Sequence, residues 1–289
     1  MIKIACYGVR PNEVPFFHKL NKHNYELTLI EDLLTHQNVD TAKGHDAVLL
    51  RGNCIADEIN LKRLSHYGVK YVFTRTVGYN HIDLKAAKKY NMPVAHVPSY
   101  SPNAIAELTL TLAMMLLRRT AYTTVRTAHK NFLVDSTMFS KEIRNCTVGI
   151  IGTGRIGLTE AKLFKGLGAN VVGYDIFENE AAKEVLTYMD LDSLLQASDI
   201  VTIHVPYIPG QNENMINEEF LSKMKRGAIL INTARGELID DLAVRQALID
   251  GKLAGFAADT LYPEPTPADH PLVALPPEVA DKAVYSPHL

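Results

Sequence analysis

Residues 148–175 read VGIIGTGRIGLTEAKLFKGLGANVVGYD, and this stretch decides the fold. Two short apolar runs, 148–151 and 171–174, flank a segment in which apolar residues recur at helical spacing, and a glycine-rich turn separates the first run from that segment. Short apolar runs next to turn residues are typical of buried strands, whereas the longer periodic segment indicates a helix. The stretch therefore predicts a strand, a helix and a second, parallel strand.

The turn after the first strand carries the pattern GxGxxG at Gly152, Gly154 and Gly157. The first glycine permits a tight turn, the second lets a pyrophosphate approach the backbone, and the third lets the helix pack closely on the strand. The start of the helix adds N–H groups without acceptors and the positive end of the helix dipole. Alone, the pattern also fits a glycine-rich turn of any α/β protein, but with strand and helix beside it we predict dinucleotide binding.

An acidic residue follows the second strand, because Asp175 comes 18 residues after Gly157. A carboxylate at this place accepts hydrogen bonds from the hydroxyl groups of the adenosine ribose and repels a 2′-phosphate. The next residues, Ile176 and Phe177, supply no arginine that could hold such a phosphate. The sequence therefore favours NAD over NADP as cofactor.

Short apolar runs alternate with helical patterns along the whole chain, which indicates an α/β fold. In the first hundred residues we predict helices at 60–66 and 82–90 and strands of a small flavodoxin-like sheet at 2–7, 47–50, 71–74 and 93–96. Further on we predict six strands, at 148–151, 171–174, 200–204, 228–232, 255–258 and 283–286.

A long helix is predicted from Asn103 to about Thr120, and because it is apolar nearly all round we expect it to be buried. Its start is a plausible domain boundary. We therefore expect a smaller flavodoxin-like substrate domain over residues 1–99 and a NAD-binding Rossmann domain over residues 100–289.

Composition argues against several other classes of protein. The 289 residues carry a formal net charge of -2, from 30 basic and 32 acidic residues that form no basic stripe, so we expect neither a nucleic acid nor a membrane as partner. Cys6, Cys54 and Cys146 are widely spaced and form no CxxC pair, which argues against disulfides and a zinc site. No apolar run approaches the length of a membrane span. We expect a cytoplasmic protein without bound metal.

Ligands of an open parallel sheet bind beyond the carboxyl ends of its strands. The residues at these ends form one candidate site: Gly152, Asp175, His204 with Pro206, Thr233 with Arg235, Asp259, and His288.

Three side chains near these ends have the chemistry that a 2-hydroxy acid requires. The guanidinium of Arg235 can hold a carboxylate through two parallel hydrogen bonds, and the imidazole of His288 can exchange a proton near neutral pH. Glu264, five residues after Asp259, could orient that imidazole and favour its cation. Arg235 also fits a surface ion pair, His288 is one of 11 histidines, and Glu264 fits a solvated loop, so spacing alone leaves both interpretations open.

The chain resembles the D-isomer-specific 2-hydroxyacid dehydrogenase family, in the branch that includes D-lactate, D-2-hydroxyisocaproate and D-2-hydroxyglutarate dehydrogenases. The resemblance covers nearly the whole chain, in the segments TRTVGYNHID, YSPNAIAELTLTLAMMLLRR, NCTVGIIGTGRIG, SDIVTIHVPY, MKRGAILINTARGELID, GKLAGFAADTLYPEP and SPH. It implies an NAD-dependent enzyme that reversibly reduces a 2-oxo acid, such as pyruvate, a branched 2-oxo acid or 2-oxoglutarate, to the D-2-hydroxy acid.

The resemblance also implies which residues act. Arg235 would hold the carboxylate, His288 would exchange the hydroxyl proton, and Glu264 would keep His288 protonated when reduction requires it. The substrate would further meet the backbone N–H groups of Val77 and Gly78, and the side chain of Tyr100. The implied cofactor contacts are Gly152, Thr153, Gly154, Arg155, Ile156, Gly157, Asp175, His204, Val205, Pro206, Thr233, Ala234 and Asp259.

Arg51 directly follows an apolar strand of the small domain, in LLRGNC. It forms either an ion pair at the rim or a contact with the substrate, at its 2-oxo acid end or at a distal carboxylate. The RGNC run resembles the hydroxyglutarate members of the branch. His81, His96 and His270 are interpreted as structural or surface groups.

Relatives continue beyond the position of Leu289, through a loop and a helix that returns to the small domain, so this return segment is expected to be missing from the given sequence. The long helix from Asn103 resembles a segment at the subunit interface of the family, which implies a homodimer. A second class of function stays open, a non-catalytic NAD-sensing interaction protein of the corepressor type. The complete set of Arg235, Glu264 and His288 favours the enzyme.

Overall fold

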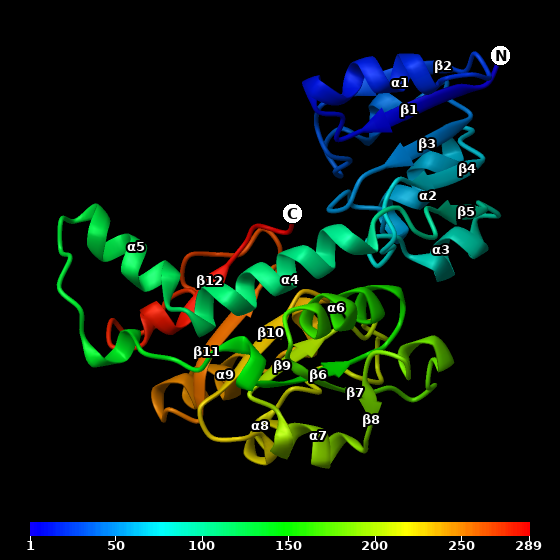
Figure 1. Ribbon diagram of the computed structural model, residues 1–289. Coiled ribbons are helices and arrows are strands. Elements are labelled where there is room, and N and C mark those ends of the chain that lie inside the picture. Colours follow the sequence, from blue (N-terminus) through cyan, green and yellow to red (C-terminus); the bar gives the residue numbers. More distant parts are fainter. The chain divides into compact units, whose positions relative to one another are not determined.

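The computed structural model describes residues 1–289, and the chain divides into two units, Met1–Tyr100 and Ser101–Leu289. Each unit is built on a parallel sheet of its own (Figure 1). The division falls one residue after the boundary expected from the sequence. None of the helices combines the length and the apolar character of a membrane span.

The first unit contains a five-stranded sheet in the order β2-β1-β3-β4-β5, which is the order of flavodoxin-like folds. Its strands are β1 (Lys3–Tyr7), β2 (Glu26–Ile30), β3 (Ala47–Leu50), β4 (Tyr71–Thr74) and β5 (Val94–His96), and its helices are α1 (Val14–Leu20), α2 (Glu58–His66) and α3 (Leu84–Lys89). Strand β2 was not predicted. It lies at the edge of the sheet and is only partly buried, so it lacks the continuous apolar run of the inner strands.

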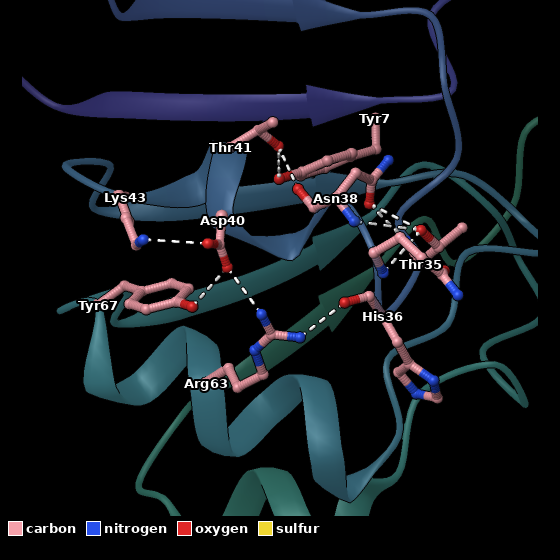
Figure 2. A network of polar contacts seen from close by, with 10 residues as sticks. Tyr7, Thr35, His36, Asn38, Asp40, Thr41, Lys43, Arg63 and Tyr67 are labelled. Atoms are coloured by element: carbon pink, nitrogen blue, oxygen red, sulfur yellow. Dashed lines mark hydrogen bonds and ion pairs between the residues drawn. The ribbon is translucent and has the colours of Figure 1, made fainter.

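A network of polar side chains ties the segment between β2 and β3 to helix α2 (Figure 2). The carboxylate of Asp40 accepts hydrogen bonds from Arg63 at 2.8 Å and from the Tyr67 hydroxyl at 2.7 Å. The hydrogen bond from Tyr67 is the main reason why the pKa of Asp40 is lowered. One residue further on, the Thr41 hydroxyl lies 2.7 Å from that of Tyr7 at the end of β1. The network therefore holds this loop between strand β1 and helix α2.

The second unit contains a seven-stranded sheet in the order β12-β11-β10-β9-β6-β7-β8, in which every pair is parallel. This is the doubly wound order of a Rossmann sheet. Its strands are β6 (Thr147–Ile151), β7 (Asn170–Tyr174), β8 (Thr187–Tyr188), β9 (Ile200–Ile203), β10 (Ala228–Asn232), β11 (Leu253–Ala258) and β12 (Ala283–Tyr285). The six predicted strands are confirmed, with ends that differ by two residues at most. The two-residue strand β8 was missed because it is too short to form a pattern.

Helices cover both faces of this sheet (Figure 1). They are α4 (Pro102–Leu117), α6 (Arg155–Gly166), α7 (Leu191–Ala197), α8 (Glu218–Lys223) and α9 (Asp241–Ile249), while α5 (Thr120–Ala128) packs on α4. Helices α4 and α6 pack side by side on one face, over a core that includes Val148 and Ile150, and α7, α8 and α9 pack on the other face, over Ile151 and Ile203.

The expectation that the long helix is buried all round was wrong. Ala106 and Ala113 of α4 are fully buried against the sheet and α6, whereas Glu107 and Thr111 are exposed. These two polar residues lie four positions apart and therefore on one face. One face of α4 packs on the Rossmann core, and the other meets solvent.

Candidate active site

The carboxyl end of the Rossmann sheet begins with the glycine turn after β6. Gly152 has a φ of +92°, and a Cβ at this position would lie 2.8 Å from the backbone carbonyl of His204. A Cβ at Gly157 would lie 2.0 Å from the carbonyl oxygen of Gly152. A Cβ at Gly154, in contrast, would meet nothing within 4 Å. The chain is closely packed behind the turn and open at Gly154, where a pyrophosphate would approach, so these residues fit a dinucleotide.

Asp175 follows β7 with its carboxylate fixed beside this turn. One oxygen accepts hydrogen bonds from the backbone N–H of Thr153 at 2.7 Å and from its hydroxyl at 3.2 Å. The other oxygen accepts the N–H of Phe177 at 3.1 Å. The neighbouring side chains of Ile176 and Phe177 are exposed and carry no charge. The carboxylate is thus held in place by the turn, which fits the ribose of NAD.

His204 lies at the end of β9, and its backbone contacts the glycine turn while its imidazole points into the protein. Its N–H donates to the Ile151 carbonyl at 2.7 Å. The imidazole is 2% exposed and contacts the fully buried carboxylate of Glu160, which also accepts the Thr202 hydroxyl at 2.8 Å. Because the ring is enclosed, His204 can line a cofactor site only through its backbone, next to the partly buried Val205 and the exposed Pro206. Sequence reasoning missed Glu160, since a single acid in a helix gives no signal.

The turn after β10 is held by a buried side chain that sequence reasoning also missed. The amide of Asn232 accepts the N–H of Ala234 at 3.0 Å and donates to the carbonyl of Arg235 at 2.8 Å. An asparagine at the end of an apolar strand is a signal for such a turn. The hydroxyl of Thr233 meets that of Thr109 in α4 at 2.8 Å, so its polar group faces the helix.

Arg235 lies in this turn, and the next residue, Gly236, packs against the segment that carries Glu264. One guanidinium nitrogen of Arg235 donates to the Ala234 carbonyl at 2.6 Å. A Cβ at Gly236 would lie 2.5 Å from the backbone nitrogen of Tyr262 and 2.6 Å from the carbonyl carbon of Leu261. The two loops therefore meet backbone to backbone.

His288 and Glu264 form a pair. Nδ1 of His288 lies 2.8 Å from one carboxylate oxygen of Glu264 and 3.0 Å from the other. An ionised carboxylate only accepts hydrogen bonds, so Nδ1 carries the proton and Nε2 is left to exchange one. The side chains are 39% and 23% exposed, so that the imidazole can reach a ligand.

Asp259, which the resemblance assigns to the cofactor, also anchors the segment that carries His288. Its carbonyl accepts the N–H of His288 at 2.9 Å. Its carboxylate accepts the Ser286 hydroxyl at 2.6 Å and the N–H of Leu289 at 3.0 Å. Arg235, Glu264 and His288 thus follow β10, β11 and β12, which are neighbours in the sheet.

In the first unit, the backbone donors without acceptors in the loop after β4 include those of Val77 and Gly78. The carbonyl of Val77 accepts a hydrogen bond from His96 at 2.9 Å, and that of Gly78 accepts the Thr76 hydroxyl at 2.7 Å. The N–H groups of Val77 and Gly78 make no hydrogen bond within the chain. The loop is therefore held by its carbonyl groups, and its N–H groups can receive a carboxylate. Tyr100, at the end of this unit, is 67% exposed.

Three adjacent strands of the first unit, β1, β3 and β4, are followed by Arg10, Arg51 and Arg75. Arg75, after β4, pairs with both oxygens of Glu13 at 2.6 and 3.1 Å. Burial raises the pKa of Glu13, but hydrogen bonds from Arg75 and from the backbone N–H of Arg10 outweigh this and lower it. Arg51, after β3, is partly buried and has no ion pair, and burial together with the charges of Arg10 and Arg75 lowers its pKa. The expected alternative of a rim ion pair at Arg51 is not found.

The fold and these residues fit an NAD-dependent dehydrogenase of hydroxy acids. Comparisons with known proteins agree. Residues 110–289 match the model of the D-isomer specific 2-hydroxyacid dehydrogenase, NAD binding domain. An aromatic 2-oxoacid reductase of Clostridium sporogenes is 41% identical over 261 residues, which cover 90% of this chain and 78% of that protein. A D-lactate dehydrogenase of Lactiplantibacillus plantarum is 42% identical over 264 residues, with the same coverage of 90% and 78%.

A solved structure gives the same result. D-lactate dehydrogenase from Aquifex aeolicus, complexed with NAD and lactic acid, matches with a TM-score of 0.87 and 32% identity, over 99% of this chain and 88% of that chain. The chain belongs to the D-isomer-specific 2-hydroxyacid dehydrogenase family. It is an NAD-dependent oxidoreductase that acts on D-2-hydroxy acids, and this decides for the enzyme over the non-catalytic alternative.

Proposed function

We propose that Arg235, Glu264 and His288 carry out the reversible reduction of a 2-oxo acid to a D-2-hydroxy acid. The contact between Glu264 and Nδ1 of His288 supports this proposal most directly, because it leaves Nε2 as the atom that exchanges a proton. When bound, NADH supplies the hydride for reduction and NAD accepts it in the reverse reaction. The cofactor contacts are those of the glycine turn, Asp175 and the strand ends.

His288 acts as the general acid in reduction and as the general base in oxidation. Protonated at both nitrogens, it donates a proton from Nε2 to the C2 oxygen of the substrate. The carboxylate of Glu264 stabilises the imidazolium through Nδ1 and fixes the orientation of the ring. Because the pair is only partly buried, the proton can be exchanged with solvent between turnovers.

Arg235 binds the carboxylate of the substrate and stabilises negative charge on the C2 oxygen. A guanidinium suits this role since its planar N–H groups match a carboxylate. The N–H groups of Val77 and Gly78 add two further donors to the same carboxylate, and Tyr100 contacts the substrate beside them. Their support is the loop geometry, which engages both carbonyl groups and leaves both N–H groups without acceptors.

Arg51 contacts the substrate as well, either at the 2-oxo acid end or at a distal carboxylate. A partly buried cation near Arg10 and Arg75 is stabilised by an anionic ligand, because burial and like charges both disfavour its charged form. Pyruvate and branched 2-oxo acids offer one carboxylate, whereas 2-oxoglutarate offers two.

The proposal is tested by following NADH oxidation with a panel of 2-oxo acids: pyruvate, 2-oxoisocaproate, phenylpyruvate and 2-oxoglutarate. We expect turnover with at least one of them, and D-configured product by chiral chromatography. Activity with none of them, in a protein that binds NADH, would contradict the proposal.

We further propose a homodimer that works in the cytoplasm. Helix α5 and the segment after it expose large apolar side chains, at Val125, Phe132, Leu133, Val134 and Phe139, all at least 60% exposed. Figure 1 shows this part extending away from the Rossmann sheet. Exposed apolar surface of this kind is typical of protein contacts. The three cysteines are free and buried, which suits a reducing compartment. Light scattering of the purified protein measures the oligomeric state, and a monomer at micromolar concentration would exclude the dimer.

A further inference from the structure

The segment that carries Glu264 has almost no hydrogen bonds of its own. Residues 262–269 are partly or fully exposed, and Pro263 and Pro265 on either side of Glu264 have no N–H to donate. Between Thr260 and Thr266, the backbone makes no hydrogen bond to other backbone groups. Apart from the pair with His288, the one hydrogen bond that holds this stretch comes from His270, which lies 3.0 Å from the carbonyl of Tyr262.

His270 is a buried side chain with a defined tautomer. It is 3% exposed, and its Nδ1 accepts the backbone N–H of Leu272 at 3.2 Å. Nε2 therefore carries the proton. That N–H points to the Tyr262 carbonyl at 3.0 Å and to the carboxylate of Asp241 at 3.1 Å. The imidazole thus joins the exposed loop to the first turn of helix α9.

The surroundings keep the imidazole in this position. Arg245 of α9 donates to the carbonyl groups of Pro271 and Ala274, at 2.6 Å each. The hydroxyl of Tyr285 in β12 donates to the carbonyl of Leu272 at 2.5 Å. Burial raises the pKa of Tyr285. These contacts fix the backbone that follows His270. The ring is therefore held in place and can hold the carbonyl of Tyr262 in turn.

The ionisable neighbours of His270 lie on α9 and β12. Asp241 faces the ring directly, and Asp240 is the residue before Asp241 in the chain. Tyr285 lies on β12. Burial raises the pKa of Asp241, against the effect of His270. Near His288 the acids are Glu264 and Asp259. These few groups are therefore the ones that a change in the pH profile of catalysis has to be assigned to.

We propose that His270 is a positioning residue for the reduction, which holds Glu264 against His288 by fixing the carbonyl of Tyr262. The proposal rests on the function proposed above for Glu264. Gly236 prevents the same stretch from moving toward Arg235, because the backbones already touch there, and His270 prevents it from moving outward. Glu264, two residues beyond Tyr262, can then reach Nδ1 of His288 without anchors of its own.

Two substitutions separate positioning from local packing. In His270→Asn, the amide can still accept the N–H of Leu272 but no longer reaches Tyr262, whereas in His270→Gln an amide nitrogen can take the place of Nε2. We expect His270→Asn to lower kcat by on the order of 10- to 100-fold, with NADH affinity and melting temperature close to wild type. We expect His270→Gln to retain most of the activity. As pH rises, the rate of reduction by His270→Asn should also begin to decline at a lower pH than the rate of wild type, because the carboxylate of Glu264 no longer stabilises the imidazolium of His288.

The decisive comparison places His270→Asn in a Glu264→Gln background. If His270 acts through Glu264, its substitution costs little further kcat there, since the carboxylate is already absent. An equal loss in both backgrounds, an unchanged pH profile, or no loss at all in the single variant would overturn the inference. If Glu264→Gln alone leaves kcat and the pH profile unchanged, the role proposed for Glu264 is itself wrong, and the inference fails with it.

Discussion

Nδ1 of His288 lies within 3.0 Å of both carboxylate oxygens of Glu264. The two residues are 24 positions apart and belong to segments that follow neighbouring strands, β11 and β12. The pair fixes which nitrogen of the imidazole faces a substrate. It follows that removal of the imidazole should affect chemistry rather than the binding of cofactor.

His288→Ala should lower kcat for reduction by roughly 10²–10⁴-fold, because general acid catalysis is lost. The glycine turn and Asp175 are untouched, so NADH should bind with an affinity close to that of wild type. Stopped-flow turnover and NADH fluorescence titration measure the two effects separately. His23→Ala, at an exposed position of the first unit, serves as the control. Near-normal turnover of His288→Ala would exclude this histidine as the acid.

Arg51→Ala should reveal which part of the substrate the cation meets. If it binds a distal carboxylate, kcat/KM for 2-oxoglutarate should fall by about 10- to 100-fold, the effect of one charged hydrogen bond, while pyruvate and 2-oxoisocaproate change little. An equal fall with all three acids would assign Arg51 to the 2-oxo acid end. Unchanged kinetics with every acid would remove Arg51 from the site. Arg51→Lys tests whether charge alone is sufficient.

Asp175→Ser should shift the cofactor preference toward NADPH. The carboxylate repels a 2′-phosphate, and its removal should raise kcat/KM for NADPH by about tenfold, which corresponds to about 1.4 kcal/mol. The value for NADH should fall, because the ribose hydroxyl groups lose their acceptor. Steady-state rates with both cofactors at a saturating 2-oxo acid give the ratio. A ratio equal to that of wild type would show that Asp175 does not face the ribose.

Cys6 predicts a loss of stability at alkaline pH. Burial raises the pKa of its thiol from 9.0 to about 12, against the effect of Arg75. Above pH 9 the thiol ionises in the unfolded chain but stays neutral in the folded one, so the unfolded state is favoured as pH rises. From pH 8 to pH 10 the free energy of unfolding should fall by about 1.4 kcal/mol through Cys6. Urea unfolding at both pH values should show a smaller fall in Cys6→Ala.

The control for this measurement is the same pair of pH values in Cys146→Ala. Burial also raises the pKa of Cys146, but this thiol lies in the second unit. If Cys6→Ala loses as much stability between pH 8 and pH 10 as wild type does, the thiol of Cys6 is not the source of the alkaline effect.

Most of the fold could be predicted from the sequence, because the inner strands of both sheets are continuous apolar runs that end at turn residues. Strand β2 escaped prediction since an edge strand is buried on one side at most, and β8 since two residues form no pattern. The exposed face of α4 was misjudged because its two polar residues were outnumbered by apolar ones. Periodicity shows what can be buried, and the neighbouring elements decide which face is buried.

The candidate site was predicted less evenly. The glycine turn and Asp175 follow from local spacing, whereas Arg235, Glu264 and His288 were singled out by resemblance alone. Contacts such as that of His270 with Tyr262 join residues whose side chains and carbonyl groups meet only in the folded chain. No pattern in the sequence encodes such a contact, because it depends on how two loops end at one edge of the sheet.

The close packing around Gly236, which has no side chain, has a consequence for the engineering of this enzyme. With no room for even a methyl group beside Leu261 and Tyr262, a saturation library at position 236 should return glycine almost alone among active clones. Directed evolution of substrate range would then succeed mainly at places that leave this contact intact, such as Arg51 and the loop of Val77.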